Sequence, residues 1–389
     1  MYISDNQELS YNKSFLTYKI KKGDTLQSVA LELEVEPRTL RAYHNMHCRI
    51  PDLIEADFKY HLEYLILAPE KKELPEEERI QNEVVFNDGA STISLNYAHI
   101  NNTYGVLYTI ESGEKIHTLK QEINVKWKAK SDNGFYFFEV TRIGNIYIND
   151  AEAGSMAQVI AEKASAALYP LLVVVDGDGK WVYINNFNQI KERWEEIKTQ
   201  IIKEFRGDSI EKYFSIYDTN LESSDSLFLS LSQDWFLNAF FNGIHTHYTS
   251  SLVINKQLDF PFIVTAKNIN YQVEQRLNKH LDRDNFIVIE IMGKLDDERT
   301  KTDFEQELGL VSKEFSEQKP TGNYKAKYFL NPNSYIVEAL NLTCDIALDV
   351  PQKYEITISN LDDKDEQVIA SRQKIFVEEI KPKKKWWSF

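Results

Sequence analysis

Strand-like segments on both sides of a helical centre constrain the fold of this chain most strongly. Between residues 106 and 143, three segments rich in aromatic and β-branched residues are each bounded by turn residues such as SDNG. In the second segment Ile123, Val125 and Trp127 alternate with polar residues, which is the period-two pattern of a half-buried strand. Strands that precede and follow a helical region predict an α+β domain with a mainly antiparallel sheet.

The centre of the chain carries the clearest helix pattern. In residues 186–205, apolar side chains recur at spacings of 4, 3, 4 and 4, which places them on one stripe of a helix. The members of this stripe are Ile190, Trp194, Ile197, Ile201 and Phe205. Asn186 followed by Gln189 predicts an N-terminal cap with a reciprocal partner. Helices are also predicted within 155–171 and 210–243, and hairpins within 171–184 and 323–348.

A charged segment divides the chain into a small and a large part. Residues 69–81 contain two prolines and mostly charged side chains, so they offer almost nothing that a core could bury. The predicted organisation is a first unit at 15–69, a charged linker at 70–81, an α+β body at 82–380 with a division into sub-domains at 82–206 and 207–380, and a basic-aromatic tail at 381–389.

Composition narrows the class of protein. The chain has 389 residues, of which 42% are hydrophobic, so there is enough apolar material for real cores. A net charge of −15 argues against general binding of nucleic acid or anionic membranes, whose phosphates would be repelled. The two cysteines, Cys48 and Cys344, do not make a disulfide framework and suit a reducing compartment.

The sequence carries neither a membrane span nor an export signal of the usual kind. No run of 18 apolar residues occurs, which predicts no transmembrane segment. The first residues lack the basic region, apolar core and small-residue cleavage site of a Sec signal. We therefore expect a cytoplasmic location, or delivery and assembly without a Sec signal.

The first unit carries the one named pattern, YKIKKGDTLQSVALELEVEPRTLRAYHN at 18–45, followed by LEYLILAP at 62–69. Gly23 permits a tight turn, and Asp24 or Thr25 can cap the helix that follows. With these residues in register, the unit resembles a LysM domain. That family is a small βααβ module that binds glycans containing N-acetylglucosamine, such as peptidoglycan and chitin.

The resemblance implies a shallow glycan groove between the loop after the first strand and the loop before the last. The residues that it assigns to the groove are Gly23, Asp24, Thr25, Leu26, Met46, His47, Ile50, Pro51 and Leu53. The second loop departs from the family pattern, because it is longer and has Glu-Ala-Asp-Phe at 55–58 where a glycine is usual. A longer loop could fill or reshape the groove. Glycan binding and protein binding by a retained scaffold therefore both stay open.

The sequence contains no recognisable catalytic or metal-binding pattern. No phosphate-binding, dinucleotide-binding, zinc-protease or serine-hydrolase motif is present, so no catalytic residue and no cofactor are predicted. His44, His47 and Cys48 lie close together, and His245 and His247 have strand spacing, but neither set reaches the four ligands of a structural zinc site. We predict no metal.

The end of the chain gives a second candidate surface. KPKKKWWSF concentrates cations and aromatic rings on an otherwise acidic protein. It is either a frayed tail or a docking peptide, since aromatic anchors beside cations are typical of interfaces. The docking residues would be Lys383, Lys384, Lys385, Trp386, Trp387 and Phe389.

The leading hypothesis is a non-enzymatic bacterial LysM protein. The family resemblance implies binding of peptidoglycan or another N-acetylglucosamine glycan. It also fits an assembly or adaptor role with a protein partner, as in phage-tail-like or type VI secretion contractile systems, where signal-less LysM proteins occur. Two alternatives remain. One is a cell-wall-active enzyme with its active site in the body, and the other is a hydrophobic-ligand carrier, which a deep apolar cavity would support.

Overall fold

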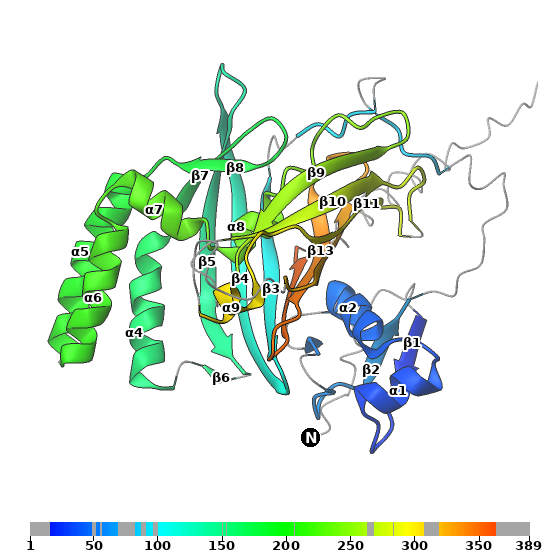
Figure 1. Cartoon of the computed structure of the whole chain (residues 1–389), viewed down its shortest axis with the longest axis horizontal. Helices are drawn as coiled ribbons and strands as arrows, with labels where there is room; N and C mark the ends of the chain where they lie inside the picture. The colour runs from blue at the N-terminus through cyan, green and yellow to red at the C-terminus, as the bar shows by residue number, and fades with distance from the viewer. Residues whose placement is uncertain are drawn as a thin grey trace, which may run out of the picture.

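One large antiparallel sheet dominates the computed structural model (Figure 1). The structure describes residues 16–48, 52–54, 57–68, 82–86, 91–95, 100–149, 151–152, 154–205, 207–262, 268–282, 284–306 and 319–362. Within these ranges the strand order is β8-β7-β5-β4-β3-β14-β13-β12-β11-β10-β9, with β6 beside β5. The α+β class and the mainly antiparallel sheet predicted from the sequence are confirmed.

The strands come from both ends of the body. Those of the first half are β3 (Asn101–Ser112), β4 (Lys115–Lys130), β5 (Tyr136–Ile148), β6 (Ala151–Glu152), β7 (Leu171–Val175) and β8 (Trp181–Ile184). Those of the second half are β9 (Val253–Phe260), β10 (Ile269–Leu277), β11 (Ile287–Leu295), β12 (Gly322–Leu330), β13 (Val337–Ile346) and β14 (Gln352–Asn360). The hairpins predicted within 171–184 and 323–348 are β7–β8 and β12–β13.

The two halves join where β14 pairs with β3. The register runs from Gln352 opposite Ser112 to Asn360 opposite Tyr104. This pairing makes the two strand-rich halves one continuous sheet. The division of the body between residues 206 and 207 stays a prediction.

Most helices of the body lie in the central stretch of the chain. They are α4 (Met156–Ser165) with the short η2 (Ala166–Leu168), then α5 (Phe187–Glu204), α6 (Asp208–Asn220), α7 (Ser224–Leu231) and α8 (Trp235–Phe240), and later α9 (Lys301–Glu305). The predicted stripe on α5 is confirmed, since Ile190, Trp194 and Ile201 are buried. No helix in the described part of the chain is both long and apolar enough to cross a membrane.

The predicted N-cap position of α5 is confirmed, but the predicted capping hydrogen bonds are wrong. Asn186 holds the N-cap position, but its side chain makes no capping hydrogen bond. Its amide Nδ2 instead donates to the carbonyl of Pro170 at 2.7 Å, and its Oδ1 accepts from the N–H of Leu172 at 2.9 Å. Asn186 therefore ties the start of β7 to the start of α5, a longer-range use of the same side chain.

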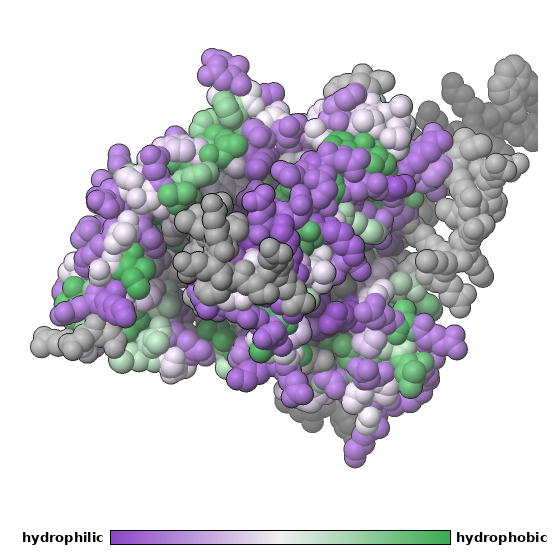
Figure 2. Space-filling view, in the orientation of Figure 1, coloured by the Kyte–Doolittle hydropathy of each residue, from purple (hydrophilic) through white to green (hydrophobic). Residues whose placement is uncertain are grey.

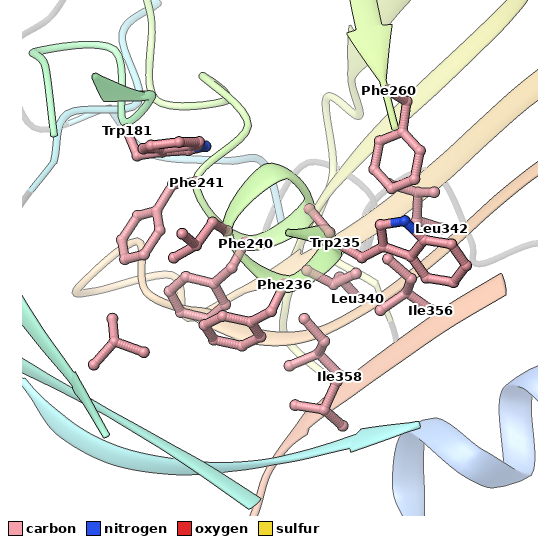
Figure 3. Close-up of a cluster of buried hydrophobic side chains, with 14 of the residues drawn as sticks. Trp181, Trp235, Phe236, Phe240, Phe241, Phe260, Leu340, Leu342, Ile356 and Ile358 are labelled. Atoms are coloured by element: carbon pink, nitrogen blue, oxygen red, sulfur yellow. The ribbon is translucent and has the colours of Figure 1, made fainter. Parts of the chain in front are cut away.

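The main core lies on the concave side of the sheet, around α8. Trp235 contacts Tyr354 of β14 with ring centroids 4.9 Å apart, and Phe240 contacts Tyr104 of β3 at the same distance. Figure 3 shows the α8 rings among the apolar side chains of β13 and β14. The space around α8 is thus occupied by the protein's own side chains, which weighs against the carrier alternative there.

The first unit forms a separate small core. It consists of β1 (Leu16–Lys19), α1 (Leu26–Glu32), α2 (Pro37–His47) and β2 (Tyr64–Leu67), and β1 pairs antiparallel with β2. Val29, Ala30 and Leu65 are fully buried between these elements. The predicted linker at 70–81 and the basic-aromatic tail at 381–389 lie outside the described residues.

Candidate functional site

The turn between β1 and α1 is built by four consecutive residues. Gly23 adopts a φ of +95°, a region that side chains disfavour. The carboxylate of Asp24 accepts from the N–H of Lys21 at 2.8 Å, which closes the turn. Thr25 is the N-cap of α1, and its hydroxyl accepts from the N–H of Ser28 while Ser28 Oγ accepts from the N–H of Thr25. This reciprocal cap explains why α1 begins at Leu26.

A side chain from the long second loop lies across the start of α1. Asp57 Oδ1 accepts from the N–H of Leu26 at 2.6 Å and from the N–H of Phe58 at 2.8 Å. Backbone N–H groups in the first turn of a helix are the natural donors for a ligand. Because Asp57 takes the Leu26 donor, the two loops that the resemblance assigns to the groove are bridged by the protein itself.

The other predicted groove residues are placed as follows. The side chain of Leu26 is buried in the small core. Leu53 is also buried, in a cluster with Cys48, Ile66 and Leu107 that faces the sheet. Met46 and His47 belong to α2, but their side chains, like residues Ile50 and Pro51, lie outside the described set. The structure therefore brings Gly23, Asp24, Thr25 and Leu26 together with Asp57, which the sequence placed in the unusual loop but not among the groove residues.

His44 and Asn45 of α2 hold the second loop through hydrogen bonds to its backbone. His44 Nδ1 accepts from the N–H of Ile66 at 3.0 Å, and its Nε2 donates to the carbonyl of Asp52 at 3.1 Å. Asn45 exchanges two hydrogen bonds of 2.8 Å with the backbone of Ile54. Burial lowers the pKa of His44 to about 4, so the ring is neutral near pH 7.

One face of α2 docks on the sheet through a network of charges. Arg41 is buried and donates to Glu355 at 2.7 Å, and it lies 3.6 Å from Glu111. Lys353 lies 3.2 Å from Glu111 and 3.7 Å from Glu355. Arg38, at the edge, lies 3.2 Å from Glu111. These five charges on α2, β3 and β14 therefore meet in one docking network.

Electrostatics at this network favour an ionised Glu111. Burial alone would raise the pKa of Glu111, but Lys353, Arg38 and Arg41 outweigh burial and hold the pKa below its usual value. Glu111 and Lys353 are also opposite each other in the β3–β14 register, which brings their side chains to the same face of the sheet. Strand pairing therefore positions two of the five charges, Glu111 and Lys353, side by side.

Apolar contacts surround the docking network. Tyr43 of α2 packs against Val288, Phe329 and Ala339 of the sheet, and also against the cluster that contains Leu53. One face of α2 thus packs in the small core, and another face packs against the sheet of the body.

His245 and the two cysteines have structural surroundings. His245 is buried, donates through Nε2 to the carbonyl of Tyr335 at 2.9 Å, and has its pKa lowered to about 4 by burial. Burial raises the pKa of Cys48 and Cys344, so neither thiol is activated. Among the residues that the structure describes, no three His, Cys, Asp or Glu side chains form a group that could hold a metal ion.

Comparison with known proteins assigns no family to the chain. No family model matches, and no curated protein matches. A solved structure concerned with lipid–protein interactions in lipovitellin aligns at 10% identity with a TM-score of 0.37, over 68% of this chain and 25% of that one. A mutant of Rh. blastica porin aligns at 10% identity with a TM-score of 0.13, over 69% of this chain and 86% of that one. Likenesses at these scores assign neither a fold nor a function to this chain.

Proposed function

We propose that this chain is a non-enzymatic assembly or adaptor protein, in which a LysM-like unit is used as a joint. The observation that carries the proposal is the docking of α2 on the sheet through the buried Arg41 and its two carboxylate partners. A module that captures a polymer from a flexible tether needs no such interface. Docking instead presents the small unit in a defined position relative to the body, which suits the assembly of several proteins.

The Asp57 hydrogen bond across the predicted groove also supports an adaptor role. Asp57 occupies the Leu26 N–H, so a glycan would have to displace a charge-assisted hydrogen bond to reach it. The face of the molecule in Figure 2 is mostly hydrophilic, with apolar residues in small separate patches. Such a surface fits a partner that binds through polar contacts. The family resemblance suggests a bacterial contractile system, phage-tail-like or type VI, as the kind of assembly.

Glycan binding is the second candidate, and Tyr60 favours it. This ring lies three residues after Asp57 and has a relative exposure of 102%, so it is fully accessible on the second loop. A free aromatic face beside polar groups is a surface on which a sugar ring can pack. Peptidoglycan would then be held at the edge of the bridged groove.

Co-sedimentation with purified peptidoglycan sacculi separates the two candidates. For an adaptor, the full-length chain stays in the supernatant, and the chain purified gently from its own cells elutes as a stoichiometric complex larger than its 45.4 kDa. If the full-length chain sediments, and Tyr60→Ala releases it while the matched surface change Phe135→Ala does not, the glycan candidate replaces the adaptor. Phe135 is a suitable control because its ring is also exposed but lies on the body.

A further inference from the structure

A groove runs between α5 and α6, and we call it the helix groove. Figure 1 shows the two helices beside each other, at the end of the molecule away from α1 and α2. The helix groove has a volume of about 720 Å³. Its α5 wall follows the helical repeat, because its members recur at spacings of 3 or 4 residues. They lie on the stripe next to the buried one, so this face of α5 is open to a ligand.

The floor of the helix groove is formed by aromatic rings that hold each other in place. Trp194 of α5 stacks on Tyr217 with ring centroids 4.4 Å apart, and it contacts Phe214 of α6 at 5.6 Å. The indole N–H of Trp194 also donates to Asp218 at 2.7 Å. In the α5 wall, Ile202 stays 49% exposed. A ligand with apolar side chains therefore gains free energy by covering Ile202.

The rim of the helix groove has an excess of negative charge. Lys198 Nζ lies 2.5 Å from a carboxylate oxygen of Asp218, so these two charges neutralise each other. The other carboxylates of the lining are Glu195, Glu211 and Glu222. Among the residues that the structure describes, no cation lies within ion-pair distance of these three glutamates. Lys191 is the only other cation in the described lining, so the rim carries a net negative charge.

The central ion pair stays charged and occupied. Burial raises the pKa of Asp218, but hydrogen bonds from Lys198 and Trp194 outweigh burial and hold the pKa below its usual value. Lys198 is thus engaged with a carboxylate of its own helix pair. A cationic ligand would meet the three glutamates of the rim rather than this pair.

The chain itself contains a segment of matching chemistry. The basic-aromatic tail KPKKKWWSF at 381–389 carries four lysines, two tryptophans and a phenylalanine. Residues 363–380 separate the tail from the described part of the chain, and 18 extended residues span up to about 60 Å. A compact body of this size is about 50 Å across. Because β14, which precedes this segment, lies in the middle of the strand order, the tail is long enough to reach the helix groove of its own chain.

We propose that the basic-aromatic tail docks in the helix groove of its own chain. Its lysines pair with the glutamates of the rim, and its aromatic rings pack over Ile202. A tethered segment has a high effective concentration, so contacts that are weak individually suffice. The helix groove shares no residue with the docking network or with the predicted glycan groove, so this inference is independent of the proposed adaptor role.

Disulfide trapping in the full-length chain tests the docking. Ser215→Cys places a thiol on the exposed lining of the helix groove, and Ser388→Cys places one in the tail. Under mild oxidation this pair should form an intrachain disulfide about tenfold faster than Ser251→Cys with Ser388→Cys, because docking raises the local concentration of the thiols. Ser251 is a suitable control because it is also exposed but lies between α8 and β9. The natural cysteines are buried.

Removal of charge from the rim provides a second readout. In the trapping protein, Glu195→Gln together with Glu211→Gln should slow disulfide formation by about fivefold, because two surface ion pairs are lost. Glu192→Gln together with Glu196→Gln is the matched control, since both residues are exposed on α5 outside the lining. Trapping no faster than with Ser251→Cys, equal rates in the two charge variants, or disulfides formed only between chains would overturn the proposal.

Discussion

The two sides of the large sheet are covered in opposite ways. On the concave side, α8 presents Trp235, Phe236 and Phe240 to strands from both halves of the body (Figure 3). On the other side, α2 presents Arg38 and Arg41 to carboxylates of β3 and β14. One covering element is held mainly by apolar burial, and the other is held by a charge network with an apolar rim.

The two kinds of contact contribute differently: apolar burial mainly stabilises the fold, and the charge network mainly orients the docked unit. Apolar burial contributes about 25 cal/mol for each Å² removed from water and has little directional preference. Desolvated ion pairs gain little net free energy, but an incorrect arrangement leaves a buried charge unpaired and is strongly disfavoured. The concave core therefore accounts for most of the fold's stability, whereas the docking network determines where the small unit sits.

Phe240→Ala should have the largest effect. The ring is buried and contacts Tyr104, Phe236 and Phe241, so its removal leaves a cavity in the core that joins both halves of the sheet. We expect the free energy of unfolding to fall by about 3–5 kcal/mol, measured by urea denaturation with tryptophan fluorescence. Phe135→Ala, at an exposed ring, should change it by less than about 1 kcal/mol. Equal effects of the two changes would contradict a core centred on α8.

Arg41→Met should have the next largest effect, confined to the docking of the small unit. It leaves Glu355 and Glu111 with Lys353 as their main buried partner, and loss of charge-assisted hydrogen bonds of this kind costs about 2 kcal/mol. Hydrogen–deuterium exchange should speed up in α2 and on β14, while the exchange of α8 stays unchanged.

Two further variants separate charge from packing at this interface. Arg38→Met should cost less than about 1 kcal/mol, because the Arg38 side chain is 56% exposed and its ion pair is screened by water. Adding Glu355→Met to Arg41→Met should recover part of the loss, since the buried carboxylate that lost its nearest cation is then removed. If Arg41→Met leaves exchange in α2 unaltered, the docking network does not orient the small unit.

Burial of His44 in the small unit and of His245 in the body predicts that acid lowers the stability of both parts. Each ring has its pKa lowered to about 4 in the folded state, against an ordinary value of 6.5. A lowered folded pKa means that the unfolded chain binds the proton more readily, so stability is full above pH 6.5 and falls as the pH drops from 6.5 toward 4. Urea midpoints across this range should decrease, and His245→Gln should flatten the decrease while lowering stability at about pH 7.5.

Sequence patterns predicted the elements better than their contacts. The period-two strands and the stripe on α5 depend on neighbours a few residues away, and the structure confirms them. Asn186 was assigned a local capping role, yet its partners lie 14 and 16 residues away. The Asp57–Leu26 bond spans 31 residues and the Arg41–Glu355 pair spans 314. Such pairings depend on strand register and helix docking, which local periodicity does not encode.

The smallest predicted effect is the pH dependence contributed by Glu111. It distinguishes the docking network from the two buried histidines. The pKa of Glu111 is held below its usual 4.5 by the nearby cations, so its contribution is present above that pH and is lost as the pH falls through the lower folded value. Protection of α2 against hydrogen exchange should therefore weaken in this acid range. Glu111→Gln should remove that part of the pH dependence but leave the change between pH 6.5 and 4 in place, because His44 and His245 are unaltered. If α2 and α8 lose protection together at every pH in the Glu111→Gln protein as in the wild type, the two sides of the sheet are one cooperative unit, and the charge network adds no separate control.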